Sequence, residues 1–418
     1  MKIGIVTTWF ERGAAYVSKQ FRDVLLLENE VIIYARGGEE YAKGDPNWDH
    51  DYVTWGEKAN TYAPTDIDLE NFSQWLKTNN IELVIFNEQQ IWAPVLLCRE
   101  LGIKTGAYID YYNEQTVPMF GVYDFLICNT KKHFSAFEWH PQCFYFPWGT
   151  DVSVFLPENL SNVTAKEVTF FHSAGMSPFR KGTDLLIKAF SELESDKAKL
   201  VIHSQVVLEE IFPELIDIIS TLKSDNKLDL HQGSVTAPGL YHKGDVYVYP
   251  SRLEGIGLTI LEACSVGLPL VVPDYGPMNE FVTPNENGQV VKVSRLWSRA
   301  DGYYWPQCEV DLSSLKNQLN YYIEQVDNLS ELKNKARDYA LANFDWSQNA
   351  QGLLSTVKEV NFLSEKIIKS ARNKARNNDV IMSKRYAIPL KDKIFQSLNQ
   401  NFPAVYQFSR SVFRKFTS

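Results

Sequence analysis

The chain has 418 residues, a length that favours two domains over one compact core. Its composition, 44% hydrophobic and 22% charged, is ordinary for a soluble globular protein. The net charge of −9 argues against nucleic acid as a partner, because an acidic body repels phosphate.

The five cysteines and the apolar segments bound the cellular setting. The cysteines are scattered and form no CxxC pair, which argues against a disulfide framework and a zinc site. The N-terminal MKIGIVTTWF is predicted to be a buried first strand and not a signal peptide. No apolar run approaches the roughly 18 residues of a transmembrane helix. We therefore expect a cytoplasmic protein.

Short apolar runs alternate with helical stretches along most of the chain. Strands are expected at 2–8, 30–35, 82–87, 104–110, 124–129, 168–173, 199–204, 228–233, 246–251 and 268–273, and helices at 18–27, 184–193 and 259–267. Alternation of this kind indicates parallel sheets with helices on both faces. The pattern runs through twice, with the polar stretch FPWGTDVSVFLPENLSNVTAKE between the two halves.

This pattern predicts an α/β protein made of two doubly wound, Rossmann-like domains that face one another across a cleft. We place the first domain at 1–158, the second at 159–346, and a helix that crosses back to the first domain, with a basic tail, at 347–418. Ligands of such sheets bind outside the carboxyl ends of the strands, so the cleft is the candidate site.

The C-terminal extension differs in charge from the rest of the chain. Residues 362–418 hold twelve Lys and Arg against three Asp and Glu, a net charge of +9, and the remainder carries −18. Ile388, Phe395 and Leu398 recur at helical spacing with basic residues between them. This pattern fits an amphipathic helix on an anionic membrane surface. A helix packed on the N-terminal domain with a solvated basic face fits it as well.

The stretch SRLEGIGLTILEACSVGLPLVVPDYG contains the most informative local pattern. Glu254 opens a turn after a strand, and Gly255 and Gly257 allow the backbone to approach a ligand closely. A helix is expected from about Leu258, with Glu262 on its first turns and free N–H groups suited to a diphosphate. The pattern indicates a nucleotide sugar, although acidic residues on a first helical turn can also serve only to stabilise the helix dipole.

Together with the following Asn279-Glu280, this stretch resembles the donor-binding signature of the retaining glycosyltransferases of family 4, which have the two-domain GT-B architecture. The resemblance implies that the diphosphate lies on the helix N-terminus, the sugar near Glu254 and the ribose near Glu262. It places the donor against Gly255, Ile256, Gly257, Leu258 and Thr259.

Other segments resemble the family in the same order along residues 1–360. In AGMSPFRKGTDLLIKAF, Arg180 and Lys181 would neutralise the charge that develops on the diphosphate, although the family's arginine after the glycine is replaced by Met176. LDLHQGSV resembles the base-binding loop, with Gly233 and Val235 as contacts. Gly13 resembles the loop glycine that approaches the donor phosphate.

A second departure from the family lies after the strand KTGAYID, where many relatives carry a histidine close to the donor sugar. Asp110 stands there and would orient a sugar hydroxyl in its place, or else it only caps the strand end. His133 and His140 lie nearby, and isolated histidines of this kind are more often structural.

The resemblance implies transfer of a sugar from a UDP-sugar or GDP-sugar to a hydroxyl, with retention at the anomeric carbon. Catalysis would rest on Glu254, Arg180, Lys181 and Asp110 and would need neither metal nor cofactor. The acidic runs 49–51 and 66–68 are interpreted as solvated loops and not as metal ligands.

The acceptor is expected to be a glycan or a lipid-linked molecule of surface polysaccharide assembly, met by the N-terminal domain, with Trp92, Tyr111 or Tyr112 stacking on a sugar. The basic extension would then hold the protein on the inner face of the plasma membrane. Three other functions stay open: a nucleotide-sugar epimerase, a phosphorylase, and a non-catalytic module that binds glycan or a partner.

Overall fold

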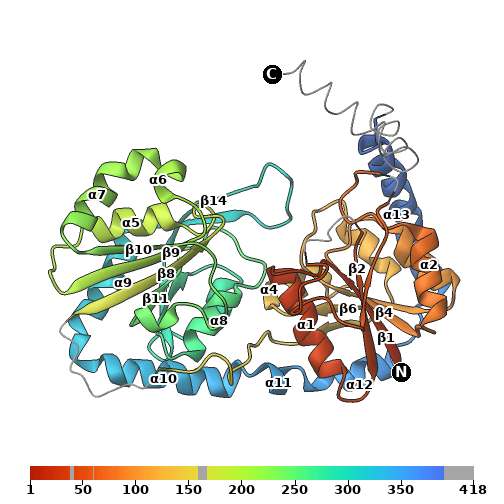
Figure 1. Ribbon diagram of the computed structural model, residues 1–418, viewed down its shortest axis with the longest axis horizontal. Helices are drawn as coiled ribbons and strands as arrows, with labels where there is room; N and C mark the ends of the chain where they lie inside the picture. The colour runs from red at the N-terminus through yellow and green to blue at the C-terminus, as the bar shows by residue number, and fades with distance from the viewer. Residues whose placement is uncertain (38–41, 60, 159–166, 390–418) are drawn as a thin grey trace.

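The computed structural model describes residues 1–37, 42–59, 61–158 and 167–389, which form two α/β domains side by side (Figure 1). Each domain has one parallel sheet with helices packed on it, so the predicted fold is confirmed. One face of each sheet has its own apolar core, and a third, continuous group of buried residues packs on the other face of both sheets.

The N-terminal sheet has seven parallel strands in the order β3-β2-β1-β4-β5-β6-β7. Their bounds are β1 Lys2–Thr7, β2 Glu30–Ala35, β3 Val53–Trp55, β4 Leu83–Asn87, β5 Lys104–Tyr108, β6 Phe125–Cys128 and β7 Cys143–Tyr145. The central strands are buried on both faces, which explains their continuous apolar runs.

The second sheet has six parallel strands in the order β10-β9-β8-β11-β12-β13. Their bounds are β8 Val168–Gly175, β9 Ala198–Ser204, β10 Leu228–Gln232, β11 Val246–Val248, β12 Leu270–Pro273 and β13 Gly288–Val291. An antiparallel hairpin follows, β14 Val293–Trp297 and β15 Gln307–Val310, and its connecting segment projects toward the N-terminal domain (Figure 1). The sequence pattern predicted neither the hairpin nor the short strands β3, β7 and β13.

Helices cover both sheets. On the N-terminal sheet they are α1 Gly13–Leu25, α2 Leu69–Thr78, α3 Ala93–Glu100 and α4 Lys131–Phe137. On the second sheet they are α5 Thr183–Ser191, α6 Leu208–Ile211, α7 Ile216–Ser224, α8 Leu258–Ser265, α9 Leu312–Glu324 and α10 Leu329–Asn343. The connections from β1 to α1 and from β11 to α8 both open on the cleft, because the carboxyl ends of parallel strands share one edge.

The chain returns to the N-terminal domain after α10, through α11 Trp346–Asn349, α12 Gln351–Glu359 and α13 Glu365–Arg385 (Figure 1). Trp346 marks the crossing: its ring lies 4.5 Å from the ring of Trp148, and its indole N–H donates to the carbonyl of Gln20 at 3.1 Å. The crossing segment therefore packs on both the interdomain linker and α1.

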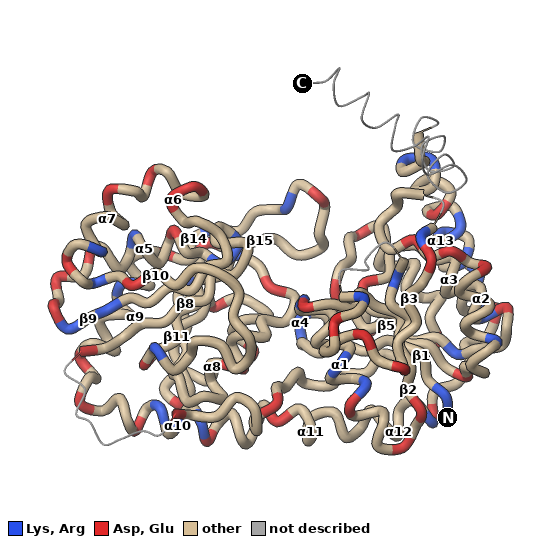
Figure 2. The backbone as a smooth tube through the Cα atoms, in the orientation of Figure 1, with Lys and Arg blue, Asp and Glu red and all other residues tan. Residues whose placement is uncertain are grey.

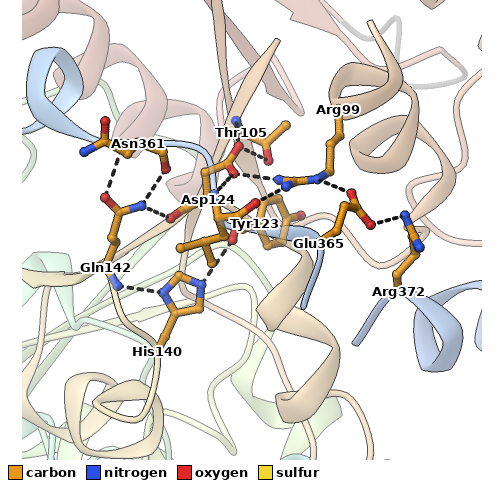
Figure 3. Close-up of polar contacts among 10 residues, drawn as sticks. Arg99, Thr105, Tyr123, Asp124, His140, Gln142, Asn361, Glu365 and Arg372 are labelled. Atoms are coloured by element: carbon orange, nitrogen blue, oxygen red, sulfur yellow. Dashed lines mark hydrogen bonds and ion pairs between the residues drawn. The ribbon is translucent and has the colours of Figure 1, made fainter. Parts of the chain in front are cut away.

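A buried carboxylate fixes the segment between α12 and α13 (Figure 3). Asp124 is fully buried, and its Oδ1 accepts from Arg99 Nη1 at 2.7 Å and from the backbone N–H of Leu363 at 2.9 Å. Its Oδ2 accepts from the backbone N–H of Thr105 at 3.0 Å. The side-chain amide of Gln142 also donates to the carbonyl of Asn361 and accepts from its backbone N–H. The segment is therefore held at two points, Asn361 and Leu363.

Helix α13 buries Ile368, Ala371 and Ala375 against the N-terminal domain and leaves its opposite face exposed. Ile388, one of the three residues that predicted the amphipathic helix, is buried at 7% exposure, whereas Phe395 and Leu398 lie outside the described residues. Of the helices in the described ranges, none combines the length and apolarity needed to cross a membrane.

Candidate functional site

Two cavities lie in the interdomain cleft, one on each side of the turn between β11 and α8. The first has a volume of about 550 Å³ and is lined by Arg12, Glu88, Asp110 and Tyr111 of the N-terminal domain and by Arg180 and Glu254 of the second, among others. The second has a volume of about 390 Å³ and includes Leu258, Thr259 and Glu262. An elongated ligand could therefore lie across the turn with one end in each cavity.

Glu254 lies at the wall of the first cavity, with 6% of its surface exposed. Its Oε1 accepts from Arg180 Nη1 at 2.9 Å, Lys181 Nζ at 2.8 Å, the Tyr249 hydroxyl at 2.9 Å and the Ser251 hydroxyl at 2.7 Å. Burial by itself would raise the pKa of this carboxyl, but Arg180 and Lys181 outweigh it and lower the pKa to about 2. Glu254 is therefore a fixed anion and not a proton carrier at neutral pH.

The two cations come from the loop before α5. Attraction to Glu254 raises the pKa of Arg180, whose side chain lines the first cavity. Lys181 lies deeper, with 14% of its side chain exposed, and contacts the Tyr249 hydroxyl as well as Glu254. Burial lowers the pKa of Lys181 to about 8, against the attraction of Glu254, which raises it. Burial therefore lowers the pKa of Lys181 by more than Glu254 raises it. Arg180, whose pKa is raised, keeps its charge more securely.

A second ion pair ties the turn to α5. Arg252 is 1% exposed and forms two bonds to Asp184, Nη1–Oδ1 at 2.7 Å and Nη2–Oδ2 at 2.8 Å. Its Nη2 also lies 3.1 Å from Glu309 Oε2, and its backbone N–H donates to the carbonyl of Arg180 at 2.7 Å. This bidentate geometry fixes the direction in which the chain enters the turn.

Helix α8 begins where the sequence predicted it. Gly257 is its N-cap and has φ +94°, a backbone conformation that L side chains rarely adopt. A Cβ at Gly257 would also lie 2.9 Å from Ile260 Cδ1. The first N–H groups of the helix have no partner within it, and Leu258 and Thr259 face the second cavity. Ile256 packs into the apolar core, so only its backbone can face a ligand.

Glu262 lies one turn further along α8 and lines the second cavity. Its Oε2 accepts from the Tyr241 hydroxyl at 2.5 Å. Burial raises the pKa of Glu262, although Tyr241 and Lys181 act in the opposite direction. Val235 lines the same cavity, whereas Gly233 lies beside it, with φ +115° and its carbonyl 2.7 Å from His203 Nε2.

Two predicted residues approach the turn from the N-terminal domain. Gly13, the first residue of α1, has Leu258 of α8 as its nearest neighbour across the cleft: an added Cβ would lie 3.7 Å from Leu258 Cδ1. Asp110 Oδ1 would lie 2.9 Å from a Cβ at Gly255, so the carboxyl and the turn are in contact. Burial and then the neighbouring Glu88 raise the pKa of Asp110 well above its usual value.

The aromatic residues expected at the acceptor side do not all reach a cavity. Trp92 is 1% exposed and Tyr112 is fully buried, so the expectation that a sugar stacks on either of them is wrong. Tyr111 lines the first cavity, and its ring stacks on that of Tyr303 at 5.5 Å. Tyr303 and Arg299 come from the segment between β14 and β15, which the sequence pattern did not single out.

Glu88 was also missed at the sequence level. It follows directly on β4, lines the first cavity, and its Oε2 lies 3.3 Å from Arg12 Nη2. Its φ of +54° is uncommon for a residue with a side chain, and such strain is concentrated at functional sites. Its position at the carboxyl end of a parallel strand is the signal that could have found it.

The two histidines differ in what they contact. His140 bonds the Tyr123 carbonyl at 3.1 Å and lies within the N-terminal domain (Figure 3). His133 reaches the other domain, with Nε2 3.0 Å from the carbonyl of Gly255. Met176, at the departure from the family pattern, is 75% exposed and lines neither cavity.

The acidic runs of the N-terminal domain have local partners. Asp49 accepts from the indole N–H of Trp55 at 2.6 Å, and Asp68 caps α2 by accepting from the N–H groups of Glu70 and Asn71. Among the residues that the structure describes, no group of three or more His, Cys, Asp or Glu side chains is arranged to hold a metal ion.

Comparison with known proteins agrees with this geometry. Residues 159–300 match the family model of glycosyl transferases group 1. Over 335 residues, 70% of this chain and 86% of the relative, the sequence is 23% identical to a GDP-mannose-dependent monoacylated alpha-(1-6)-phosphatidylinositol monomannoside mannosyltransferase of Corynebacterium glutamicum. A lipopolysaccharide core biosynthesis mannosyltransferase of Rhizobium leguminosarum is 35% identical over 121 residues, 28% of this chain and 34% of that protein.

Solved structures share the fold. A glycosyltransferase from Rickettsia africae superimposes with a TM-score of 0.68 at 17% identity, over 86% of this chain and 98% of that one. Anabaena HepE in complex with UDP gives a TM-score of 0.66 at 16% identity, over 85% of this chain and 99% of that one. Residues 159–300 are therefore similar to the glycosyl transferases of group 1, and the chain as a whole has the two-domain GT-B architecture.

Proposed function

We propose that this glycosyltransferase moves a sugar from a UDP-sugar or a GDP-sugar to a hydroxyl of a glycan or lipid-linked acceptor, with retention at the anomeric carbon. The observation that carries the proposal is the position of Glu254, an ionised carboxylate held by two cations on the wall of the first cavity, next to the turn whose helix lines the second. One cavity suits a nucleoside and the other suits the transferred sugar and its acceptor.

We expect the donor to lie across the two cavities in one direction. The diphosphate would lie at the start of α8, where free N–H groups and the positive end of the helix dipole favour an anion. Glu262 would accept the ribose hydroxyls through the carboxylate oxygen that Tyr241 does not occupy, with the base toward Val235. The sugar would then lie between Glu254 and Asp110 in the first cavity.

The relatives support both donor classes. The Corynebacterium enzyme is described as GDP-mannose-dependent, and HepE has been crystallised with UDP and with UDP-glucose. These donors belong to those proteins, and for this chain they define which nucleotide sugars to test first.

The side chains supply charge stabilisation for a departing diphosphate. As the bond between the anomeric carbon and the phosphate oxygen breaks, negative charge grows on that oxygen and positive charge on the sugar ring. Arg180, Lys181 and the N-terminus of α8 would stabilise the first, and Glu254 the second. The acceptor hydroxyl would attack from the face that the diphosphate leaves and pass its proton to the departing phosphate oxygen, which gives retention. Nothing in this set of groups requires a metal.

The acceptor is proposed to come from a membrane surface. The C-terminal end of α13 lies beside the first cavity, because the N–H of Tyr62 donates to the carbonyl of Tyr386 at 2.8 Å and Thr65 lines the cavity. Lys and Arg recur along α13 (Figure 2). Its exposed cations include Lys366, Lys369, Lys374, Lys384 and Arg385, and Ile367, Val380 and Ile381 are exposed among them. An anionic bilayer bound there would present a lipid-linked acceptor to the cavity mouth.

The catalytic proposal is tested by nucleotide release. Wild type and Glu254→Gln are incubated with UDP-glucose, UDP-N-acetylglucosamine and GDP-mannose, with and without a lipid extract as acceptor, and UDP or GDP is measured. Loss of one transition-state contact is expected to lower turnover about 100-fold or more in the variant. Glu209→Gln is the matched control, because Glu209 forms a lysine pair on the surface of the same domain.

Three results would contradict the proposal. Equal turnover of wild type and Glu254→Gln would remove the role of that carboxylate. Conversion of the nucleotide sugar without release of nucleotide would indicate an epimerase. Absence of turnover with every donor, together with binding of glycan, would indicate a non-catalytic module. The anomeric configuration of the product, read from its one-bond C–H coupling by NMR, decides between retention and inversion.

The membrane proposal is tested by vesicle flotation with and without phosphatidylglycerol. Replacement of Lys366, Lys369, Lys374 and Lys384 by Gln leaves the buried face of α13 intact, whereas deletion of the whole helix would expose the apolar core. At about 1 kcal/mol per lysine, binding to anionic vesicles should fall roughly 100-fold or more, and binding to neutral vesicles should not change. Equal flotation of the two proteins would contradict membrane docking by α13.

A further inference from the structure

A series of hydrogen-bonded side chains crosses the interdomain cleft and ends on the turn between β11 and α8, called the donor turn below. Trp305 Nε1 donates to the Tyr112 hydroxyl at 2.6 Å, that hydroxyl lies 2.8 Å from His133 Nδ1, and His133 Nε2 lies 3.0 Å from the carbonyl of Gly255. Trp305 and Gly255 belong to the second domain, whereas Tyr112 and His133 belong to the first. This series of hydrogen bonds therefore starts in the second domain, passes through two residues of the N-terminal domain, and ends in the second domain.

The chemistry of the groups fixes the direction of each bond. A carbonyl oxygen can only accept, so His133 must carry its proton on Nε2 and donate to Gly255. The neutral imidazole then accepts on Nδ1, and the Tyr112 hydroxyl donates to it. The hydroxyl oxygen is left to accept from Trp305, whose indole N–H can only donate. Every donor in this series of hydrogen bonds therefore faces an acceptor.

The two members of this series from the N-terminal domain are removed from water. His133 is 1% exposed and Tyr112 is fully buried. Burial lowers the pKa of His133 to about 4, and the neighbouring Lys132 acts in the same direction, so the neutral form is present at physiological pH. The bond between His133 and the Tyr112 hydroxyl is therefore costly to break, because neither group can turn to solvent.

The helix that carries His133 is itself attached to the donor domain. The backbone N–H groups of Lys131 and Lys132, at the start of α4, donate to the carboxylate of Glu280 at 2.5 and 2.8 Å. The ammonium of Lys132 donates to the carbonyl of Gly276 at 2.6 Å. His133 is therefore delivered to the turn by a helix whose N-terminus the other domain caps, and its position depends on how the two domains are apposed.

The bonded carbonyl lies in the most sensitive part of the turn. Gly255 directly follows Glu254, and the orientation of its carbonyl sets the peptide plane that leads into Ile256 and the N-cap of α8. Glycine restricts its own backbone less than any other residue, so an external bond is needed to select one conformation. Asp110 also lies close to Gly255, since its Oδ1 would be 2.9 Å from an added Cβ there.

We infer that His133 is a positioning residue. It holds the Gly255 carbonyl from the acceptor domain and thereby sets the placement of the Glu254 carboxylate and of the α8 N-terminus when the two domains meet. The consequence is that domain closure and the geometry of the donor site are coupled through one imidazole. This inference rests on the proposed role of Glu254 in catalysis.

The test compares His133→Phe, which cannot donate, with His133→Gln, whose side-chain N–H can. His140→Phe is the matched control, because His140 is a buried histidine of the same domain that bonds only within it. In His133→Phe, kcat for nucleotide release from UDP-glucose or GDP-mannose is expected to fall about 10- to 100-fold, the effect of a small misplacement of reacting groups. The Kd for free UDP or GDP by calorimetry is expected to rise by a smaller factor than kcat falls, because the nucleoside end of the site is not touched and the misplacement acts mainly on the transition state.

The variants separate positioning from simple loss of stability. His133→Gln should recover part of kcat, and His140→Phe should lower Tm while kcat is kept. Tyr112→Phe, a milder change that removes the bond to Nδ1, should lower kcat in the same direction and is the alternative if His133→Phe does not fold. Unchanged kcat in both His133→Phe and Tyr112→Phe, or an equal loss of kcat in His140→Phe, would overturn the inference.

A readout without turnover distinguishes this inference from the proposed function. Amide hydrogen exchange of peptides that cover residues 253–261 is expected to be several-fold faster in His133→Phe than in wild type and His140→Phe. Should wild type release no nucleotide from any donor, the proposed function fails while the exchange result still reports on the turn. Identical exchange in all three proteins would refute the positioning role.

Discussion

The titration of Lys181 gives the sharpest prediction for the site. Lys181 is the buried cation beside Glu254, and burial lowers its pKa to about 8. Its charge is proposed to stabilise the departing diphosphate, so the free enzyme should lose activity as the ammonium loses its proton. With a pKa of about 8, roughly one tenth of the molecules keep the charge at pH 9, and kcat/KM should be about tenfold lower there than at neutral pH.

The fall in activity at alkaline pH, the alkaline limb of the pH profile, should lie at a different pH for kcat/KM than for kcat. The limb in kcat/KM reports the free enzyme, whereas the limb in kcat reports the enzyme with donor bound. A bound diphosphate places negative charge next to Lys181 and raises its pKa. We therefore expect the limb in kcat to lie at higher pH than the limb in kcat/KM.

Unfolding caused by the titration of Lys181 cannot explain this fall in activity. The pKa of Lys181 is about 8 in the folded chain and 10.5 when exposed, so between these values the unfolded chain binds more protons. The free energy of unfolding therefore rises with pH across that window, by up to about 3 kcal/mol from this lysine. Activity should fall while the contribution of Lys181 to stability increases.

The assay is nucleotide release from pH 6 to 10 for wild type and Lys181→Arg. Arginine keeps its charge over this range, so the variant should lose the limb near pH 8 even if its turnover is lower. Lys333→Arg is the control, because Lys333 pairs with Asp245 away from the turn and its replacement should leave the limb in place. A flat kcat/KM in wild type, or the same limb in Lys181→Arg, would refute the reasoning.

Three further predictions concern stability, measured by urea unfolding. Asp184→Ala leaves the buried Arg252 without its bidentate partner and should lower the free energy of unfolding by about 3–5 kcal/mol. Gly182→Ala should cost clearly more than Gly102→Ala, because both have positive φ but only at Gly182 would the Cβ meet a backbone oxygen, at 2.1 Å. Asp124→Asn turns one acceptor of the clasp in Figure 3 into a donor that faces donors and should cost about 3 kcal/mol.

Each of these has its own contradicting result. A loss of under about 1 kcal/mol in Asp184→Ala would mean that Arg252 rearranges to Glu309 or to solvent. Equal costs at the two glycines would mean that backbone strain, about 1–3 kcal/mol, accounts for both and that the close approach relaxes. A loss of under about 1 kcal/mol in Asp124→Asn would mean that the hydrogen bonds of Asp124 to Arg99 and Leu363 do not hold the segment between α12 and α13.

The alternation of apolar runs and helices was enough to predict two parallel sheets, because a strand buried on both faces needs a continuous apolar sequence. The turn from Glu254 to the start of α8 was predicted for a similar local reason: a strand end, two glycines and a helix start lie within a dozen residues. Short strands such as β13 were missed because four residues at a sheet edge carry too little periodicity to be distinguished from a loop.

The N-terminal side of the cleft could not be predicted to the same depth. Trp92 and Tyr112 follow strands and looked available to a ligand, but the packing of α13 and of the segment after β14 buries them. Tyr303 lies 192 residues beyond Tyr111 in the chain, and only the fold of the hairpin stacks the two rings.

The sequence by itself therefore determined the two sheets and the turn that opens α8, since each depends on residues close together in the chain, whereas Arg180 and Lys181 were singled out only through the family resemblance. The tertiary structure decided which side chains face the cavities, how Arg180 and Lys181 share one carboxylate oxygen, and that His133 of one domain bonds Gly255 of the other. Those contacts depend on burial and on the apposition of two separately folded cores, and no local pattern of residues encodes the distance between them.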